Sequence, residues 1–296
     1  MEGFEGRVAV VIAGGNGIGR SIAHALADAG CDIVIADYRG DDAEAVRAEV
    51  EAKGRRSIAV RTDVKERADV ERLADIAYDS FGRVDILINN AGVTLRPFRA
   101  IWDVTYEDMK YVVNTNIWGL LNGVHVFVPR MRATPGDKHI VNTSSMAALC
   151  IVPGNALYGL TKAGVDGLSH VMREELAGEN IGVTVLYPGL VNTPAAEKSG
   201  ELRSEAERQS DAKMLSWFDY AESRGEERAK DVGAGRGRMS VIDGEETAVP
   251  IEPALVGPMV VDAIRHNRPF CMTHPAPKTA ITKRADELLR SYHPAS

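Results

Sequence analysis

The sequence predicts an α/β protein built on a doubly wound parallel sheet of about seven strands, with helices on both faces. In the first half of the chain, short β-branched runs alternate with longer segments of helical period, which is the pattern of a parallel sheet covered by helices. The 296 residues are 45% hydrophobic and include only 13 prolines, as expected of a globular protein with a sizeable core. The net charge of -7, without a basic run, disfavours a main role on nucleic acid.

Six strands and five intervening helices are expected before residue 194. The strands are 8–12, 32–36, 57–60, 84–88, 139–143 and 183–186, and the helices are 17–29, 41–53, 66–81, 106–131 and 155–178. No linker separates these elements, so residues 1–296 are expected to form a single domain.

The composition changes after this first part of the chain. Residues 194–250 contain 22 charged residues among 57 and are expected to be a charged insertion, part helix and part mobile loop, that forms a lid over the substrate. After the insertion, we expect a helix over 253–267, a seventh strand over 270–272 and a helix over 281–292. Residues 251–296 would thereby complete the sheet.

The cysteines and the N-terminus indicate a cytoplasmic protein. Cys31, Cys150 and Cys271 are odd in number and widely spaced, so neither a disulfide framework nor a zinc site is indicated. The first residues are acidic where a signal peptide would be basic, and no run is apolar enough to cross a membrane. The seven histidines lack metal-binding spacing, so packing or solvent roles, and no metal, are expected.

A glycine-rich turn follows the first expected strand and opens a helix. In this context Gly14, Gly15, Gly17 and Gly19 would let backbone amides at a helix N-terminus approach a pyrophosphate. A tight strand-to-helix turn is the alternative interpretation of the glycines alone. Asp37, at the end of the second strand, favours the dinucleotide interpretation because a carboxylate there meets the adenosine ribose.

A second group of polar residues has the pattern of an acid/base site. Tyr158 and Lys162 are four residues apart on an expected helix, and this spacing brings the phenol and the ammonium onto one face. A nearby cation favours the phenolate, so Lys162 would make Tyr158 a usable base near neutral pH. Ser144 and Ser145 follow the preceding strand at the edge of the sheet where such folds bind ligands.

With these residues the chain resembles the classical short-chain dehydrogenase/reductase family, closely up to Thr193 and more loosely after Pro250. The matching residues are Gly17, Ile18, Gly19, Asp37, Asp63, Val64, Asn89, Asn90, Ala91, Gly92, Asn116, Ser145, Tyr158, Lys162, Pro188, Gly189 and Thr193. The resemblance implies a Rossmann-type fold and a catalytic set of Asn116, Ser145, Tyr158 and Lys162. In the family the serine stands thirteen residues before the tyrosine, which selects Ser145.

The resemblance also implies the residues that hold the cofactor. These are Gly14, Gly15, Asn16, Gly17, Ile18, Gly19, Asp37, Asp63, Val64, Asn90, Ala91, Gly92, Tyr158, Lys162, Pro188, Gly189, Val191 and Thr193. Asp63 and Val64 would edge the adenine, and Pro188, Gly189 and Thr193 would hold the nicotinamide end. One departure is that Ile12-Ala13 replaces the family's Thr-Gly, which is expected to change the loop and the affinity for the cofactor.

The expected activity is hydride transfer between NAD and a small-molecule secondary alcohol or its ketone. Tyr158 would be the acid/base, Ser145 would orient the substrate oxygen, and Asn116 would hold a water that links Lys162 to solvent. NAD is expected to be preferred, with NADP possible because Arg39 softens the repulsion between Asp37 and a 2'-phosphate. The alternatives are a non-catalytic dinucleotide-binding sensor or scaffold, and an epimerase or dehydratase of the extended branch of the superfamily.

The expected substrate is bulky and hydrophobic or aromatic. The side chains that would line its pocket are Leu95, Phe98, Leu149, Ile151, Val152 and Pro153, with Trp217 or Phe218 from the lid. An alternative interpretation is that Trp217, Phe218 and Tyr220 form a small satellite core instead of contacting the substrate. By resemblance, the helices over 106–131 and 155–178 would pair two copies of the chain into a homodimer or homotetramer.

Overall fold

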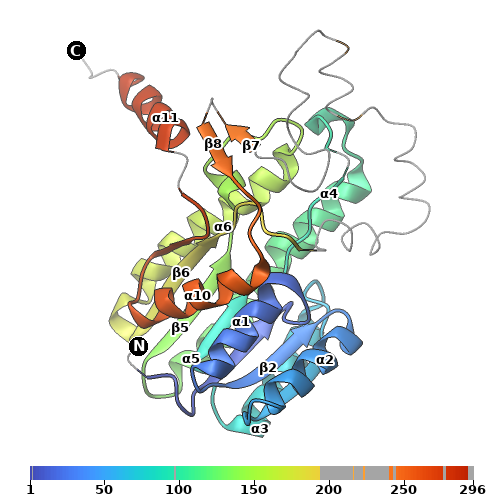
Figure 1. Cartoon of the computed structure of the whole chain (residues 1–296), viewed down its shortest axis with the longest axis vertical. Coiled ribbons are helices and arrows are strands. Elements are labelled where there is room, and N and C mark those ends of the chain that lie inside the picture. Colours follow the sequence, from blue (N-terminus) through green and yellow to red (C-terminus); the bar gives the residue numbers. More distant parts are fainter. Residues whose placement is uncertain are drawn as a thin grey trace.

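A seven-stranded parallel sheet forms the centre of the protein. The computed structural model describes residues 1, 3–96, 98–193, 240–242, 245–275 and 278–292, with the single positions 216 and 223. The strands are β1 (Val8–Ile12), β2 (Asp32–Asp37), β3 (Ser57–Arg61), β4 (Ile86–Asn89), β5 (Lys138–Thr143), β6 (Ile181–Tyr187) and β9 (Phe270–Met272). Their order is β3-β2-β1-β4-β5-β6-β9, so the predicted fold is confirmed; Figure 1 labels β2, β5 and β6 of this sheet among the helices that cover it. The order reverses between β1 and β4, the position at which doubly wound sheets bind ligands.

Two layers of helices cover the sheet because successive side chains of each strand point to opposite faces. Ala9 and Val11 of β1 belong to the core beneath one layer, and Val10 and Ile12 belong to the core beneath the other. The first layer is α1 (Gly17–Asp28), α2 (Gly40–Glu51) and α10 (Val256–Arg265), and the second is α3 (Arg67–Phe81), α5 (Gly119–Arg132) and α6 (Ala156–Glu175). Among the residues described, no helix is both long and apolar enough to cross a membrane.

The helix predicted over 106–131 is not uniform. It begins as α4 (Tyr106–Val113), widens into a π-helical turn over Asn114–Trp118 and continues as α5. Thr105 caps its start by accepting a hydrogen bond from the Asp108 amide at 3.1 Å. A π-helical turn inside an α-helix often marks a functional position, and this one contains Asn116.

The described end of the charged insertion differs from the prediction. Residues 240–248 were expected to be helix or loop, but β7 (Ser240–Ile242) and β8 (Glu245–Ala248) pair as an antiparallel hairpin. Trp217, Phe218 and Tyr220 lie outside the described residues. The residues on either side of the insertion meet, because Val191 and Ile251 form a parallel bridge. The chain then ends with α10, β9 and α11 (Lys278–Arg290).

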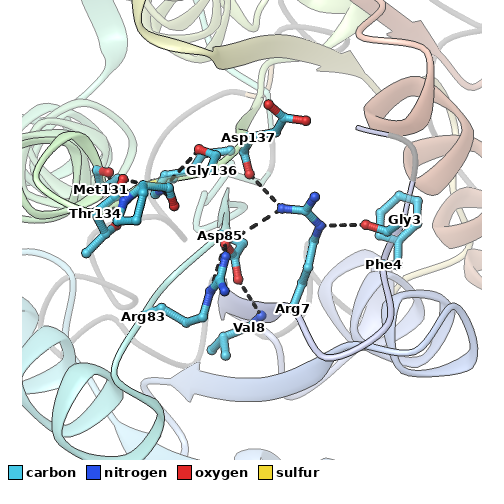
Figure 2. Close-up of polar contacts among 12 residues, drawn as sticks. Gly3, Phe4, Arg7, Val8, Arg83, Asp85, Met131, Thr134, Gly136 and Asp137 are labelled. Carbon is cyan, nitrogen blue, oxygen red and sulfur yellow. Dashed lines mark hydrogen bonds and ion pairs between the residues drawn. The ribbon is translucent and has the colours of Figure 1, made fainter.

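Charged residues fasten the amino edge of the sheet. Asp85 is 0% exposed, and Figure 2 shows it between the Val8 amide and the side chains of Arg7 and Arg83. Its carboxylate accepts a hydrogen bond from the Val8 amide at 3.0 Å and others from Arg83, and Arg7 Nη1 lies 3.8 Å away. Arg7 also donates to the carbonyl oxygen of Asp137 at 2.7 Å. These contacts tie the starts of β1, β4 and β5 together and leave the carboxyl edge for the site.

Candidate active site

The glycine turn joins β1 to the N-terminus of α1. Ala13 has φ +57 and Gly17 has φ +53, so the replacement of the family's glycine at position 13 places a methyl group in the left-handed region. A Cβ on Gly19 would lie 1.9 Å from the Ala13 carbonyl oxygen, which means that this close packing of helix on turn requires glycine.

The N-terminus of α1 has donors to offer an anion. Asn16, its N-cap residue, makes no capping hydrogen bond, and the first turn contains no acidic residue. The Asn16 side chain donates instead to Asp42 Oδ2 at 3.3 Å. The first backbone N–H groups of a helix have no partner within the helix, and they favour phosphate.

Asp37 is a buried carboxylate that connects the end of β2 to the glycine turn. Its Oδ2 accepts a hydrogen bond from the Gly15 amide at 2.9 Å, and its Oδ1 accepts one from the Arg39 amide at 3.0 Å. A Cβ on Gly15 would contact both Asp37 and Asp42. Asp42, which the sequence analysis missed, therefore adds a second carboxylate to this part of the site.

Asparagine side chains hold the carboxyl ends of the central strands together. Asn90 Nδ2 donates to the Ala13 carbonyl oxygen and Asn90 Oδ1 accepts from Thr143 Oγ1, both at 3.2 Å. One residue earlier, Asn89 Nδ2 donates to Asn142 Oδ1 at 2.8 Å. The resemblance assigned this sheet-stabilising position to the Asn90 loop, and the contacts fit that assignment.

Tyr158 and Lys162 lie one turn apart on α6, with Lys162 Nζ 5.6 Å from the centre of the tyrosine ring. Lys162 is buried, and its Nζ donates to the Thr143 carbonyl oxygen at 2.8 Å. Burial lowers the pKa of Lys162 to about 8. Burial raises the pKa of Tyr158, while a hydrogen bond with Ser145 acts in the opposite direction. Both groups thus lie in an environment that penalises charge and strengthens their mutual interaction.

The two serines after β5 have different partners. Ser144 Oγ donates to the Lys162 carbonyl oxygen at 2.8 Å, which fastens α6 to the sheet. Ser145 Oγ accepts a hydrogen bond from the Ala147 amide at 3.1 Å and contacts the Tyr158 hydroxyl. The residue that the resemblance selected is therefore the serine that meets the phenol.

Asn116 holds the loop that follows β4. Its side-chain amide pairs with both backbone groups of Val93, at 2.8 and 3.0 Å, and donates to Thr161 Oγ1 at 3.0 Å. A Cβ on the neighbouring Gly92 would lie 3.1 Å from Lys162 Nζ and 3.6 Å from Asn116 Oδ1. The structure therefore brings Asn116, Ser145, Tyr158 and Lys162 to one edge of the sheet.

The residues after β6 face the glycine turn. A Cβ on Gly17 would lie 3.1 Å from Thr193 Cγ2. The Pro188 carbonyl oxygen accepts from the Met146 amide at 3.1 Å, which links this segment to the residue after Ser145. The Gly189 amide donates to Thr273 Oγ1 at 3.0 Å. Thr273 and His274, beyond β9, were not predicted to belong to the site because no local pattern signals this contact.

The remaining predicted cofactor residues surround the same edge. Asp63, after β3, forms an ion pair with Lys65 at 3.4 Å, and Val64 is buried against the position of Gly119. Ile18 and Ala91 are partly buried against the two cores. The donors at α1, the carboxylate of Asp37 and the close approach of Lys162 and Asn116 to Gly92 are arranged as a dinucleotide site requires.

Comparisons with known proteins agree with this geometry. A sequence model described as short chain dehydrogenase matches residues 7–204. The 1-deoxy-11-beta-hydroxypentalenate dehydrogenase of Streptomyces exfoliatus is 36% identical over 191 residues, which are 64% of this chain and 70% of that protein. The putative oxidoreductase SadH of Mycobacterium tuberculosis is 32% identical over 265 residues, 87% of this chain and 93% of that protein.

Solved structures extend the similarity over the full length. A short chain dehydrogenase/reductase from Burkholderia phymatum, solved in complex with NAD, has a TM-score of 0.82 and 30% identity, covering 100% of this chain and 99% of that chain. A putative short-chain dehydrogenase from Novosphingobium aromaticivorans has a TM-score of 0.75 and 30% identity, with 100% and 90% covered. The chain belongs to the short-chain dehydrogenase family and is an oxidoreductase.

Proposed function

We propose that the protein is an NAD-dependent dehydrogenase that interconverts a bulky hydrophobic or aromatic secondary alcohol and its ketone, with Tyr158 as the acid/base. The observation that carries this proposal is the meeting of the Tyr158 phenol, the buried Lys162 ammonium and the Ser145 hydroxyl at the edge of the sheet. A non-catalytic sensor or scaffold needs the dinucleotide site but not this combination.

In the oxidative direction Tyr158 takes the proton of the substrate hydroxyl, and in the reductive direction it returns that proton. Ser145 holds the substrate oxygen beside the phenol, since its hydroxyl already contacts Tyr158. Lys162 stabilises the phenolate by its charge. A bound nicotinamide supplies the carbon that accepts the hydride. Asn116 and Lys162 both lie close to Gly92, and Asn116 would hold a water that connects the Lys162 ammonium to solvent.

The preference for NAD is supported by the charge around the glycine turn. Asp37 and Asp42 both lie against Gly15, so a 2'-phosphate on the adenosine ribose would meet two carboxylates. Arg39 is the opposing influence, because it precedes α2 as its N-cap residue and its backbone amide donates to Asp37. NADP is therefore the weaker cofactor in this proposal.

An apolar substrate is supported by the side chains beyond Ser145. Ile151 is 84% exposed, and Leu149 packs with a small cluster of Met146, Val185, Tyr187 and Met272. Phe98 is buried, and the Arg96 guanidinium carbon lies 4.5 Å from the centre of its ring, so the proposed pocket would have a cation beside its apolar groups. The name of the Streptomyces exfoliatus relative describes a hydroxylated substrate, which agrees with an alcohol.

The test is turnover of secondary alcohols and ketones of increasing apolar size with both cofactors, read by absorbance of the reduced nicotinamide. Tyr158→Phe keeps the ring and removes the acid/base oxygen, so it should lose at least about a hundredfold in kcat while NADH binding is retained. Wild-type binding without any turnover would favour the sensor or scaffold instead. Normal turnover by Tyr158→Phe would contradict the mechanism.

We also propose that residues 194–250 close over the substrate. Most of this segment lies outside the described residues, and the support is the Val191–Ile251 bridge, which joins the residues on either side of it. Limited proteolysis should cut this segment more slowly when NAD and substrate are both present. Equal cleavage rates with and without ligand would contradict the lid.

A homodimer or homotetramer is the proposed assembly. Trp118 before α5, and Leu160 and Val171 on α6, are more than half exposed, and a second copy would cover them. A monomeric mass by light scattering at micromolar concentration would contradict this assembly.

The free thiols of Cys31, Cys150 and Cys271 support a reducing, cytoplasmic location.

A further inference from the structure

Two residues that follow β9 hold the segment that follows β6. The Gly189 amide donates to Thr273 Oγ1 at 3.0 Å, and Thr273 Oγ1 lies 2.7 Å from Nδ1 of His274. The other ring nitrogen of His274, Nε2, lies 3.1 Å from the Val249 carbonyl oxygen. Three segments that are far apart in the sequence are thus joined by a single hydroxyl and a single imidazole.

The direction of these hydrogen bonds follows from the groups involved. A carbonyl oxygen only accepts hydrogen bonds, so Nε2 of His274 is protonated and donates a hydrogen bond to the Val249 carbonyl oxygen. In a neutral imidazole Nδ1 is then an acceptor, and the Thr273 hydroxyl donates to it. The same hydroxyl oxygen accepts from the Gly189 amide. Every group in the chain of contacts therefore has the partner it requires, and the neutral imidazole has one fixed tautomer.

Packing strengthens this arrangement. Thr273 and His274 are only 7% and 8% exposed. A Cβ on Gly189 would lie 2.5 Å from Nδ1 of His274, so the imidazole ring lies directly on the glycine backbone. Glycine is needed at position 189 because a larger residue would displace the ring.

The held segment is fixed from two further sides. The Pro188 carbonyl oxygen accepts from the Met146 amide at 3.1 Å, next to Ser145. Beyond Gly189, the Leu190 carbonyl oxygen accepts from the Ile251 amide at 3.0 Å, and the Asn192 amide donates to the Ile251 carbonyl oxygen at 2.9 Å. His274 contacts Val249 at the base of the same insertion. The position of Gly189 thus depends on the insertion base and on the end of β9 together.

We propose that Thr273 and His274 are positioning residues for the nicotinamide half of the cofactor pocket, acting through the backbone of Gly189. The proposal rests on the proposed dinucleotide site, in which residues 188–193 hold the nicotinamide end. The adenosine half is built separately, from the glycine turn after β1 and from Asp37 at the end of β2. Loss of the Thr273 hydroxyl should consequently weaken the binding of the nicotinamide half alone.

The experiment compares two ligands that differ in that half. NADH and ADP-ribose share the adenosine, both phosphates and the second ribose, but only NADH carries nicotinamide. Isothermal titration calorimetry measures the affinity of each ligand for two variants. Thr273→Val keeps the shape of the side chain and removes the hydroxyl, and Thr273→Ser keeps the hydroxyl. Because removal of one partner of a buried hydrogen bond is costly, Thr273→Val should bind NADH about tenfold more weakly than wild type. Its ADP-ribose affinity should stay within about twofold, and Thr273→Ser should restore NADH binding.

His274→Ala gives the second variant, with His266→Ala as its matched control. His266 lies at the end of α10, is exposed and contacts only Asp262 by the hydrogen bonds and ion pair found for it. His274→Ala should show the same selective loss for NADH, and His266→Ala should behave as wild type. If His274→Ala does not fold, as judged by its thermal unfolding, Thr273→Val against Thr273→Ser decides the question.

Two results would overturn the proposal. The first is that Thr273→Val binds NADH as tightly as wild type does. The second is that it loses affinity for NADH and ADP-ribose equally, as expected of a general loss of structure. Failure of the proposed function is a different outcome. In that case the wild-type protein would bind both ligands without oxidising any alcohol, and the selective effect of Thr273→Val on binding would remain measurable.

Discussion

The backbone amide of Gly15 donates a hydrogen bond to Oδ2 of Asp37 at 2.9 Å, which fixes a buried carboxylate against the glycine turn. The carboxylate cannot swing away from a ligand in this position without losing that bond and the one from Arg39. A cofactor bound at the end of β2, as proposed, would therefore meet a negative charge that is fixed in place.

Cofactor choice should follow from this contact. We expect kcat/KM for NAD to exceed that for NADP by on the order of a hundredfold, since like charges brought together cost several kcal/mol. Asp37→Ser should strongly reduce the ratio of kcat/KM for NAD to kcat/KM for NADP. Asp41→Ser, which removes an exposed carboxylate of α2, should leave it unchanged. A wild-type preference for NADP would show that Arg39, rather than Asp37, governs this pocket.

Ala13 stores backbone strain in the glycine turn. Its φ of +57 is unfavourable for a residue with a Cβ. Ala13→Gly should raise the free energy of unfolding by about 0.5 to 1 kcal/mol, the relief of strain exceeding the added entropy of the unfolded chain. Ala25→Gly, within the regular part of α1, should lower it by about 1 kcal/mol. Urea unfolding measures both, and a destabilised Ala13→Gly protein would contradict the strain.

The dependence of oxidation on pH should report the Tyr158–Lys162 pair. Oxidation needs the phenolate, so kcat/KM should rise with pH as the pair loses a proton. Lys162→Met removes the cation and should move the midpoint of that rise upward by about one pH unit or more, besides lowering the rate. An unchanged midpoint in Lys162→Met, measured between pH 6 and 10, would show that Lys162 does not tune the phenol.

His139 should make the fold sensitive to acid. Burial lowers the pKa of His139 to about 3. Between about pH 3 and about pH 6.5, the imidazole is therefore protonated in the unfolded chain and neutral in the folded protein. The stability supplied by the neutral imidazole is complete above about pH 6.5 and falls by about 1.4 kcal/mol for each unit below it. His139→Gln should remove this part of the slope. Parallel slopes for the two proteins in urea unfolding at pH 5 to 7 would contradict the assignment.

Asp85 should be among the most sensitive positions for stability. Asp85→Ala leaves the buried Val8 amide without its acceptor and removes the carboxylate that Arg7 and Arg83 contact, at a cost of about 1 to 3 kcal/mol. Asp137→Ala is the control, because Arg7 bonds only the backbone carbonyl there. Equal midpoints for the two variants in thermal unfolding would show that the Asp85 contacts contribute little.

Most of the sheet could be predicted from the sequence because its strands are short, apolar and separated by clear turns. The seventh strand, Phe270–Met272, was predicted with its observed bounds. The π-helical turn at Asn116 could not be predicted, since no glycine or proline interrupts residues 106–118. The β7–β8 hairpin was missed because its strands are only three and four residues long, although the sequence between them is Asp-Gly, a dipeptide typical of hairpin turns.

The same distinction holds for the candidate site. Tyr158, Lys162 and Asp37 could be found because spacing along one helix or position at a strand end already implies their neighbours. Thr273 and His274 lie more than 80 residues from Gly189, and only the pairing of β6 with β9 brings them together. Contacts of this kind depend on the sheet as a whole and leave no local pattern.

The bridge between Val191 and Ile251 has a consequence for the history of this chain. A segment that leaves and re-enters the framework at one point can be lengthened, shortened or replaced without moving the strands on either side, because closing a longer loop costs little entropy. With the lid role proposed above, exchange of residues 194–250 would change substrate preference between relatives. Transplanting this segment from a relative should transfer substrate choice while the hydride chemistry of the recipient is kept.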